Sequence, residues 1–497
     1  MAKDKSKKQF RPKPRLPRGF RDIGGAELER QQQMITTLAA VYRLHGFMPL
    51  DSAAFEYADA LGKFLPDDDR PNEGVFSLQD DDEQWLSLRY DLTAPLARYV
   101  AEHYDSLPKP FRRYQWGHVW RNEKSGPGRY RQFLQMDADT VGAANMAADA
   151  EICMLAVRCM EAVGLSKGAY QIRVNNRKIM DGLLQVIGLS PDDENYEQRR
   201  LTILRAMDKY DRLGAAGVEA LLGAGRKDES GDFTKGAELT DAQIAPIARL
   251  VAIPDDDRTA TLAAMAELVG GNASGKNGLA ELAEMDELFT GLGFGAEQIC
   301  IAPPVVRGLG YYTGPIFEIE LGFEVEDENG KAVPFGSVGG GGRYDDLIKR
   351  FKGVEVPATG ISIGISRLAA ALELRDGAKM GANSPPVIVL VMDKQDRPDL
   401  LELVQTLQKE GIAAEMYMGD SAMKAQLRYA DNRGAWLALI IGEDERKANV
   451  ITIKDLRLGQ EKAATIQDNK EWRASAHAQQ QIPRADIVGR IKEILGS

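Results

Sequence analysis

One feature above all restricts how this chain can fold: two strand-like stretches flank a loop that neither a helix nor a strand can continue. The stretches cover residues 111–121 and 131–141, and the loop between them carries Ser-Gly-Pro-Gly at positions 125–128. Glycine and proline so close together interrupt regular backbone structure, whereas the flanking residues have the composition of strands. The sequence therefore predicts a long-looped antiparallel hairpin over residues 111–141.

One face of the predicted hairpin is too polar for an ordinary protein core. Side chains alternate along a strand, so the second stretch directs an arginine, an aromatic ring, an amide and two carboxylates to the same side. Buried charges are costly unless a ligand or partner satisfies them, and arginine can hold a phosphate while an aromatic ring stacks on a base. The face is thus predicted to bind ATP beside a small acid, with a partly exposed sheet of ion pairs as the alternative. Its residues are Arg131, Phe133, Gln135, Asp137 and Asp139, joined from the first stretch by Arg121, Val119, Gly117 and Gln115.

Charge and composition indicate which ligands and which compartment suit this site. The net charge is −11, yet residues 109–131 hold seven basic side chains and one acidic one, so a local patch rather than the total would attract phosphate. A solvated charged face is the alternative interpretation of that patch. Three cysteines without a Cys-x-x-Cys pair and four scattered histidines predict neither a disulfide framework nor a metal site, and they fit a reducing cytoplasm. No apolar run approaches the roughly 18 residues of a membrane span.

The chain of 497 residues is long enough for two or three domains. Residues 1–20 are basic, contain proline and lack an apolar centre, which predicts a solvated arm rather than a secretory signal. Alanine and leucine recur at helical spacing through residues 181–290, which predicts a helical insertion between the strand-rich stretches 21–180 and 291–380. After a Gly-Ala-Asn-Ser-Pro-Pro linker, residues 385–497 alternate between strand and helix patterns and predict a compact α/β domain with a parallel or mixed sheet.

Three motifs resemble those of class II aminoacyl-tRNA synthetases. The hairpin carries Arg121-Asn-Glu123 and then Arg129-Tyr-Arg131-Gln-Phe133, which resemble motif 2. Gly-Ile-Ser-Ile-Gly-Ile-Ser-Arg-Leu at residues 360–368 resembles motif 3. Apolar residues at helical spacing predict a helix over residues 26–44, and this helix, which leads into Met48-Pro49, resembles motif 1.

Four further stretches narrow the resemblance to the histidyl-tRNA synthetase family. Residues 306–314 and 339–345 resemble the two motifs peculiar to that family, and residues 88–93 and 16–22 match it as well. A single motif of this kind is weakly specific, whereas several in the right order, from about residue 16 to residue 368, are strongly specific.

The resemblance implies an α+β fold and an activity. The expected parts are a class II antiparallel-sheet catalytic domain over residues 21–180 and 291–380, the helical insertion at 181–290, and a C-terminal α/β anticodon-binding domain at 385–497. The expected activity is that of a histidine–tRNA ligase, which activates L-histidine with ATP and transfers it to the 3′ end of tRNA(His). Mg²⁺ is expected with the pyrophosphate. A cytoplasmic homodimer without a membrane partner is expected too.

The resemblance also assigns roles to individual side chains. Arginine side chains would neutralise the charge that develops on the α-phosphate. No protein base is needed, because the carboxylate of histidine itself attacks the phosphorus. Polar groups that pair the imidazole nitrogens would reject apolar analogues, since those groups would be left unpaired. The expected catalytic residues are Arg121 and Arg307. Histidine is expected to contact Asp91, Thr93, Arg121, Gln135, Asp139, Arg307, Tyr311, Tyr312 and Tyr344, and ATP is expected to contact Arg121, Glu123, Arg129, Phe133 and Arg367.

Four positions depart from the family pattern. Gly310 and Ser366 stand where the family usually or often has an acid, and Asp91 and Asp139 are shorter than the glutamates of many bacterial members. A pocket with two shortened carboxylates must close by other means or bind histidine slightly differently.

The alternative function is that of the histidine-sensing regulatory subunit of ATP phosphoribosyltransferase. That non-catalytic protein resembles the same catalytic core, but it lacks the anticodon domain and tends to lose the catalytic arginines. This chain has Arg121, Arg307 and Arg367 and continues for about a hundred residues beyond Pro386. These features favour the ligase.

Overall fold

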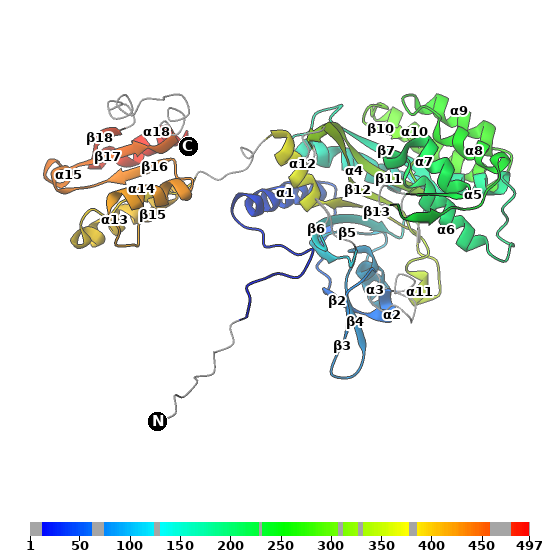
Figure 1. Ribbon diagram of the computed structural model, residues 1–497, viewed down its shortest axis with the longest axis horizontal. Coiled ribbons are helices and arrows are strands. Elements are labelled where there is room, and N and C mark those ends of the chain that lie inside the picture. Colours follow the sequence, from blue (N-terminus) through cyan, green and yellow to red (C-terminus); the bar gives the residue numbers. More distant parts are fainter. Residues whose placement is uncertain are drawn as a thin grey trace. The chain divides into compact units, whose positions relative to one another are not determined.

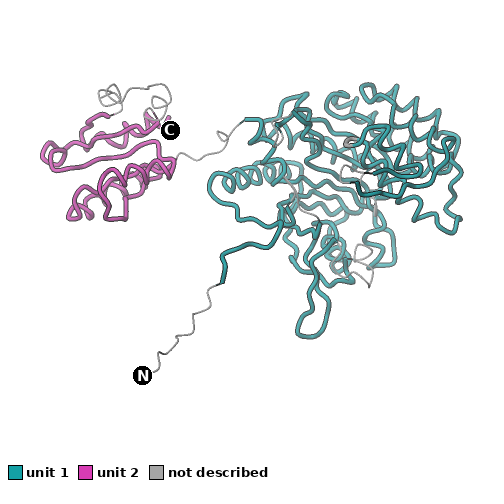
Figure 2. Tube along the Cα trace, viewed as in Figure 1, with its two compact units in different colours: residues 1–380 teal, residues 381–497 magenta. Residues whose placement is uncertain are grey.

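A computed structural model describes residues 12–61, 74–123, 130–227, 231–306, 312–326, 332–376, 385–457 and 479–496, without the side chains of residues 211 and 212. The chain divides into two compact units, Met1–Met380 and Gly381–Ser497 (Figure 2). Each unit buries its own set of apolar side chains, as expected of domains with separate cores.

An eight-stranded sheet organises the first unit (Figure 1). Neighbouring strands pair antiparallel from β5 to β7, whereas the outer strands β1 and β10 pair parallel with β5 and β7. This pattern confirms the antiparallel sheet expected of the first unit. In spatial order the strands are β1 (Met48–Pro49), β5 (Phe111–Trp120), β6 (Gln132–Val141), β13 (Ala358–Gly364), β12 (Ala332–Arg343), β11 (Pro315–Glu326), β7 (Tyr170–Asn176) and β10 (Ile299–Ile301).

The predicted hairpin is confirmed as strands β5 and β6. They pair along their whole length, from Phe111 opposite Val141 to Trp120 opposite Gln132. The Ser-Gly-Pro-Gly loop between them lies outside the described residues.

Helices cover one face of this sheet (Figure 1). The even-numbered residues Leu134, Met136 and Ala138 of β6 belong to the same buried core as these helices. Because strand side chains alternate, the odd-numbered residues of β6 point to the opposite side. The covering helices are α1 (Gly25–Leu44), α4 (Met146–Ala162) and α12 (Ile365–Asp376).

Smaller elements adjoin the ends of β5 and β6. Helix α3 packs Leu96 and Val100 against Phe111 and Val141, which lie at the start of β5 and the end of β6. A three-stranded antiparallel sheet in the order β2-β4-β3 precedes α3 in the chain. These elements are β2 (Phe55–Tyr57), α2 (Ala58–Leu61), β3 (Ser77–Gln79), β4 (Trp85–Leu88) and α3 (Thr93–His103), with the short α11 (Lys349–Lys352) after β12.

Between β7 and β10 the chain is largely helical, and the proposed helical insertion, predicted at residues 181–290, lies in this part. Helices α5 and α10 meet at two glycines: a Cβ atom on Gly182 would lie 2.9 Å from the Cα of Gly275, so only glycine fits there. The segment also contains a two-stranded hairpin that the sequence pattern did not predict. Its elements are α5 (Arg177–Val186), α6 (Tyr196–Met207), α7 (Tyr210–Leu222), β8 (Gly225–Lys227), β9 (Phe233–Lys235), α8 (Asp241–Val251), α9 (Arg258–Val269) and α10 (Ala273–Gly291).

The second unit is an α/β domain with a mixed five-stranded sheet, which confirms its predicted class. The sheet order is β15-β14-β16-β17-β18, with parallel pairing around β14 and antiparallel pairing of β17 with both its neighbours. The elements are β14 (Val387–Val389), η2 (Lys394–Asp396), α13 (Arg397–Lys409), β15 (Ala414–Met416), α14 (Met423–Asn432), β16 (Leu437–Ile440), α15 (Glu443–Ala448), β17 (Val450–Asp455), β18 (Gln479–Pro483), η4 (Arg484–Asp486) and α18 (Ile487–Leu495).

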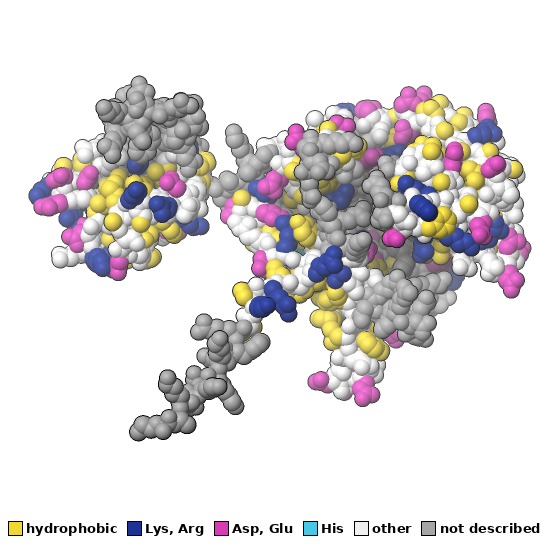
Figure 3. Space-filling view, in the orientation of Figure 1, with side chains coloured by type: hydrophobic (Ala, Val, Ile, Leu, Met, Phe, Trp, Pro, Cys, Tyr) yellow, Lys and Arg dark blue, Asp and Glu magenta, His cyan; other side chains and the backbone are white. Residues whose placement is uncertain are grey.

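Charged side chains of both signs are mixed on the visible surface of the described residues. On the face shown in Figure 3, basic and acidic side chains are interspersed over both units, although the net charge is −11. Among the helices of the described residues, none combines the length and the apolar character that crossing a bilayer requires.

Candidate active site

The candidate site lies on the face of β5 and β6 that is turned away from α1, α4 and α12. The strand register places Val119 opposite Phe133, Gly117 opposite Gln135, and Gln115 opposite Asp137. The same-face set predicted from alternation is therefore correct along both strands.

Arg121 lies at one end of this face. Its Nε donates a hydrogen bond to the carbonyl of Tyr90 at 3.2 Å, and its guanidinium carbon lies 5.1 Å from the ring centre of Phe133. The backbone N–H of Arg121 also donates to the carbonyl of Arg131 at 2.8 Å, which extends the pairing beyond β5 and β6. Arg121 and Phe133 are both half-buried, so a flat ligand can reach the ring and the guanidinium together.

The N-terminal stretch 16–22 contacts this end of the site. The backbone N–H of Arg131 donates to the carbonyl of Gly19 at 2.8 Å, and the guanidinium of Arg21 lies 4.2 Å from the ring centre of Tyr130. Glu123 is exposed here, and its carbonyl accepts a hydrogen bond from the Arg131 side chain at 3.0 Å. The stretch 16–22 thus contacts Tyr130 and Arg131, where the chain continues after the hairpin loop.

Arg367 comes from α12, which begins directly after β13. The last residue of β13, Gly364, pairs with Gln135 of β6, so Arg367 lies three residues beyond a site position. Its guanidinium donates to the carbonyls of Ser337 at 2.6 Å and Phe335 at 3.0 Å on β12. These contacts hold the guanidinium against the sheet.

Ser366, one of the departures from the family pattern, has a backbone role. Its hydroxyl oxygen accepts the backbone N–H of Leu134 at 3.0 Å. The hydroxyl therefore ties the start of α12 to the start of β6.

Asp139 occupies the other end of the face. Its carboxyl Oδ1 accepts the hydroxyl hydrogen of Tyr344, and its Oδ2 forms an ion pair with the Arg113 guanidinium at 3.0 Å. Gly360 of β13 lies directly opposite, and a Cβ atom there would come within 2.0 Å of Asp139 Oδ1. The carboxylate therefore occupies space that only a glycine neighbour leaves free.

Burial controls the protonation of the acids on this face. It raises the pKa of Asp139, with Arg113 and the Tyr344 hydroxyl acting in the opposite direction. It raises the pKa of Asp137 to about 7, opposed mainly by Arg113 and reinforced by Asp139. Two acids so close together are difficult to ionise at once.

Gln135 and Asp137 present buried acceptor atoms between the two ends. The Gln135 amide donates to the hydroxyl of Ser362 at 2.9 Å. In the described part of the chain, neither Gln135 Oε1 nor Asp137 Oδ1 has a hydrogen-bond partner. Buried acceptors of this kind suit a ligand that carries N–H donors.

Asp91 and Thr93 stand at the start of α3. The Asp91 carboxylate accepts the backbone N–H of Ala94 at 2.9 Å, and Thr93 is buried. Burial raises the pKa of Asp91, while that N–H and the charge of Arg121 lower it, and Asp139 contributes as a nearby like charge. The charges at both ends of the face, on Arg121 and Asp139, therefore act on the Asp91 carboxylate.

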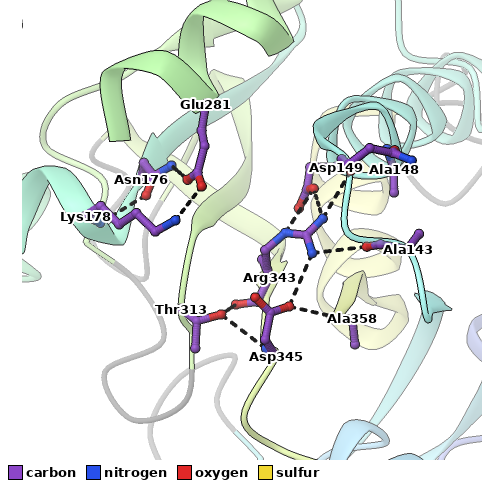
Figure 4. Close-up of polar contacts among 11 residues, drawn as sticks. Ala143, Ala148, Asp149, Asn176, Lys178, Glu281, Thr313, Arg343, Asp345 and Ala358 are labelled. Atoms are coloured by element: carbon purple, nitrogen blue, oxygen red, sulfur yellow. Dashed lines mark hydrogen bonds and ion pairs between the residues drawn. The ribbon is translucent and has the colours of Figure 1, made fainter. Parts of the chain in front are cut away.

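The backbone around Tyr344 is fixed by its neighbour Arg343, at the end of β12 (Figure 4). The buried Arg343 guanidinium forms an ion pair with Asp149 of α4 and another with Asp345 at 3.2 Å. It also donates to the carbonyl of Ala143 at 3.1 Å. These contacts anchor the chain from which the Tyr344 hydroxyl reaches Asp139.

Three predicted site residues, Arg129, Arg307 and Tyr311, lie outside the described residues, as does Gly310. The chain just before Arg307 is held by Asn175 of β7, whose side-chain amide donates to the carbonyls of Pro303 and Val305, each at 2.9 Å. Just after Tyr311, Tyr312 is half-buried beside Gly342, where an added Cβ would lie 3.0 Å from the Tyr312 ring.

The sequence pattern assigns no individual role to two buried residues of this face. Arg113 is one of the seven basic residues between positions 109 and 131, for which a solvated face is the alternative interpretation, yet its side chain is 0% exposed. For Asp137, strand alternation predicts a position on this face and no specific function. Alternation alone places Arg113 on this face, because the period that groups Arg121 with Gln115 continues to position 113, but alternation does not show that the side chain is buried.

The chain matches two family models. Residues 19–368 match histidyl-tRNA synthetase, and residues 386–494 match the anticodon binding domain.

Named relatives are similar along nearly the whole chain. A histidine–tRNA ligase from Brucella ovis is 54% identical over 485 residues, which cover 97% of this chain and 96% of the relative. One from Caulobacter vibrioides is 51% identical over 488 residues, with 98% of each chain covered.

Solved structures agree with this assignment. The histidyl-tRNA synthetase from Nostoc sp. PCC 7120 matches with a TM-score of 0.72 at 26% identity, covering 97% of this chain and 100% of that one. A Bacillus halodurans protein described as an ATP phosphoribosyltransferase regulatory subunit/histidyl-tRNA synthetase matches with a TM-score of 0.63 at 21% identity, covering 85% and 97%, and shares the fold. The chain belongs to the histidyl-tRNA synthetase family.

Proposed function

We propose that this chain activates L-histidine with ATP and transfers the histidyl group to the 3′ end of tRNA(His). One observation carries the proposal: a single sheet face has Arg121 stacked near Phe133 at one end and Asp139 bonded to Tyr344 at the other. The first pair suits a nucleotide and its phosphate, and the second suits a ring with N–H groups. Arg121 and Asp139, at the two ends, both influence the Asp91 carboxylate. Asp91 would therefore lie between the two substrates, where they meet.

ATP is proposed to bind at the Arg121 end. Phe133 would stack on the adenine, and Arg121 would hold the α-phosphate together with the histidine carboxylate. Glu123 and Arg129 would orient the adenine and the γ-phosphate, and Arg367 would hold the γ-phosphate from the start of α12.

Histidine is proposed to bind at the Asp139 end. Asp91, Thr93 and Gln135 would hold the α-amino group, whereas Asp139 and Tyr312 would bond the imidazole nitrogens. Residues that would line the remaining pocket are Tyr311 and Tyr344.

The chemistry then requires alignment and charge stabilisation. A carboxylate oxygen of histidine forms a bond to the α-phosphorus as the bond to pyrophosphate breaks, and Arg121 and Arg307 would neutralise the charge that develops on the α-phosphate. In the second step a hydroxyl of the terminal ribose of tRNA forms the ester bond, and AMP leaves.

Mg²⁺ is proposed to enter with ATP. In the described part of the chain, no group of three or more His, Cys, Asp or Glu side chains is arranged to hold a metal ion. Mg²⁺ usually keeps several waters and binds through substrate phosphates and one or two carboxylates, so a protein cage is not required. The ion would neutralise charge on the pyrophosphate.

Three further properties are proposed from family membership. The second unit would bind the anticodon of tRNA(His), two copies of the chain would form a homodimer, and the protein would act in the cytoplasm.

The test is the exchange of labelled pyrophosphate into ATP with a panel of amino acids. Exchange is expected with L-histidine and not with the others. Arg121→Ala should lower the histidine-dependent rate about 10²–10³-fold, the usual effect of removing one transition-state donor. Arg433→Ala is the matched control, because this arginine pairs with Glu415 in the second unit and should leave the exchange unchanged.

The same assay separates the ligase from a histidine-sensing regulator. A regulator would bind histidine without any exchange. A purified protein that binds histidine and gives no exchange would therefore overturn the proposed function.

A further inference from the structure

Arg113 is a fully buried arginine between the two halves of the proposed histidine site. It lies on β5 directly opposite Asp139 of β6, and its side chain is 0% exposed. A buried guanidinium is costly unless charges and acceptors surround it, so its contacts indicate its purpose.

One nitrogen of Arg113 makes both of its described contacts. Nη2 lies 3.0 Å from Asp139 Oδ2 and donates to the carbonyl of Leu92 at 2.8 Å. Leu92 stands between Asp91 and Thr93, the two residues proposed to hold the α-amino group of histidine. Arg113 therefore joins the carboxylate at the imidazole end to the backbone at the α-amino end.

Asp139 is held from two sides. Tyr344 donates its hydroxyl hydrogen to Oδ1, and the Arg113 guanidinium forms an ion pair with Oδ2 at 3.0 Å, so contacts on both oxygens restrict the plane of the carboxylate. Gly360 leaves room for that plane, because any Cβ there would collide with Oδ1. A short acid that is clamped in this way can present a defined direction to a ring N–H without the reach of a longer side chain.

Arg113 also places a positive charge that acts on two buried acids. It is the strongest influence that lowers the pKa of Asp137 and of Asp139 against the effect of burial. Loss of the guanidinium would leave both acids with a greater tendency to hold protons, and Asp139 would then be a poorer acceptor.

We propose that Arg113 is a positioning residue for histidine selection, which fixes the Asp139 carboxylate and ties it to the Asp91–Thr93 segment. The inference rests on the proposed function and adds a residue to it. It also accounts for how a pocket with two shortened acids is closed: the gap is bridged from β5 by a buried arginine.

The competing explanation is that Arg113 only neutralises buried charge and stabilises the fold. Arg258 provides a matched control for that explanation. Its buried guanidinium pairs with Asp286 and donates to the carbonyls of Ile299 at 2.8 Å and Phe294 at 3.0 Å, all within the helical insertion and its junction with β10. It thus combines one carboxylate with backbone carbonyls, as Arg113 does, at a different place.

The experiment compares Arg113→Met, Arg113→Lys and Arg258→Met with the unchanged protein in histidine-dependent pyrophosphate exchange. Arg113→Met should raise the KM for histidine about 10- to 100-fold, the usual effect of losing a charged hydrogen-bonding partner, with little change in the KM for ATP. Arg113→Lys should give an intermediate KM, because it restores the charge without the planar fork. Arg258→Met should leave both KM values unchanged.

A second measurement follows selectivity. The preference for histidine over β-(2-thienyl)alanine, a ring of similar shape without N–H groups, should fall in Arg113→Met and hold in Arg258→Met. A purely structural role for Arg113 would lower the amount of active enzyme and leave this ratio unchanged.

The outcomes are distinct. An unchanged histidine KM and selectivity in either soluble Arg113 variant, or equal rises in the KM for both substrates, would overturn the inference. If Arg113→Met does not fold, Arg113→Lys decides. Absence of exchange in the unchanged protein would instead refute the proposed function.

Discussion

At the scale of single residues, Asp137 is an acid whose protonation the fold alters. It is 1% exposed, and burial together with Asp139 raises its pKa to about 7 despite the opposing charge of Arg113. An unfolded chain would release the same proton near 3.8. Between these values the native state binds more protons than the unfolded state, so this group makes stability depend on pH.

The sign of that dependence is testable with Asp137→Asn. The contribution of Asp137 to stability is fully present below its unfolded pKa and is lost as the pH rises through about 7. The variant has no titrating group, so it should gain stability relative to the unchanged protein between about pH 5 and about pH 8, by an amount on the order of 1–4 kcal/mol. Urea unfolding of both proteins at the two pH values measures the difference. A difference that is constant with pH would contradict the assignment.

Site residues were predictable from sequence where strand alternation alone determines their side of the sheet. Phe133, Gln135 and Asp139 follow from the period of a strand, and the register confirms their common face. The importance of Arg113 does not follow in the same way, because a sequence cannot distinguish an arginine that solvent surrounds from one that is 0% exposed. Its partner Leu92 is 21 residues away and contributes only a carbonyl, which has no signature in sequence.

At the scale of elements, Arg343 connects the end of β12 with α4. Its guanidinium pairs with Asp149 and Asp345 and donates to the carbonyl of Asn145, which precedes α4, at 3.3 Å. Asp149 is 0% exposed, and burial raises its pKa to about 6 although Arg343 opposes the shift. The two elements are therefore joined by a buried ion pair that neither partner can leave without cost.

We expect Arg343→Met to destabilise the first unit by about 3–5 kcal/mol, because it leaves the Asp149 carboxylate buried without its main partner. The double variant Arg343→Met/Asp149→Asn should be less unstable than the sum of the two single changes, since no buried charge remains. Chemical unfolding of the four proteins measures this coupling. The exposed pair Lys349 and Glu355 is the control, and Lys349→Met should leave the unfolding midpoint nearly unchanged. Additive effects at Arg343 and Asp149 would contradict the coupling.

Elements with their own periodicity were predictable, whereas elements formed by pairing were not. Helix α1 and strands β5 and β6 carry clear patterns. Strand β18 is Gln-Gln-Gln-Ile-Pro, a sequence without strand preference, and its extended form depends on pairing with β17. The six-residue helix α15 is fixed by Glu445, which accepts the backbone N–H of Gly442 at 2.9 Å and the Thr452 hydroxyl at 2.8 Å.

At the scale of the whole molecule, the two units have separate cores and separate proposed tasks. The first unit holds the candidate active site, and the second matches the anticodon binding domain over residues 386–494. The buried apolar side chains of the second unit come from its own elements, such as Leu400 of α13 and Ile451 of β17. Removal of this unit should therefore leave the core of the first unit intact.

Ending the chain at residue 384 should preserve histidine-dependent pyrophosphate exchange within a fewfold, because both small substrates are proposed to bind the first unit. Charging of tRNA(His) should fall far more, because the proposed anticodon contacts are lost. Both rates are measured on the truncated and the full-length protein, with thermal unfolding as the check that the first unit folds. Equal loss of both rates would mean that the second unit is needed to fold or assemble the first.

The parallel pairing of β7 with β10 has a consequence for the helical insertion. The chain leaves the sheet at Asn176, at the end of β7, and re-enters at Ile299, which lies opposite Ile172 near the start of that strand. Parallel neighbours cannot be joined by a tight turn, and their crossover requires a dozen or more residues. A shortened descendant of this chain could lose most of α5 to α10, but some bridge of about that length must survive for the sheet to keep its last strand.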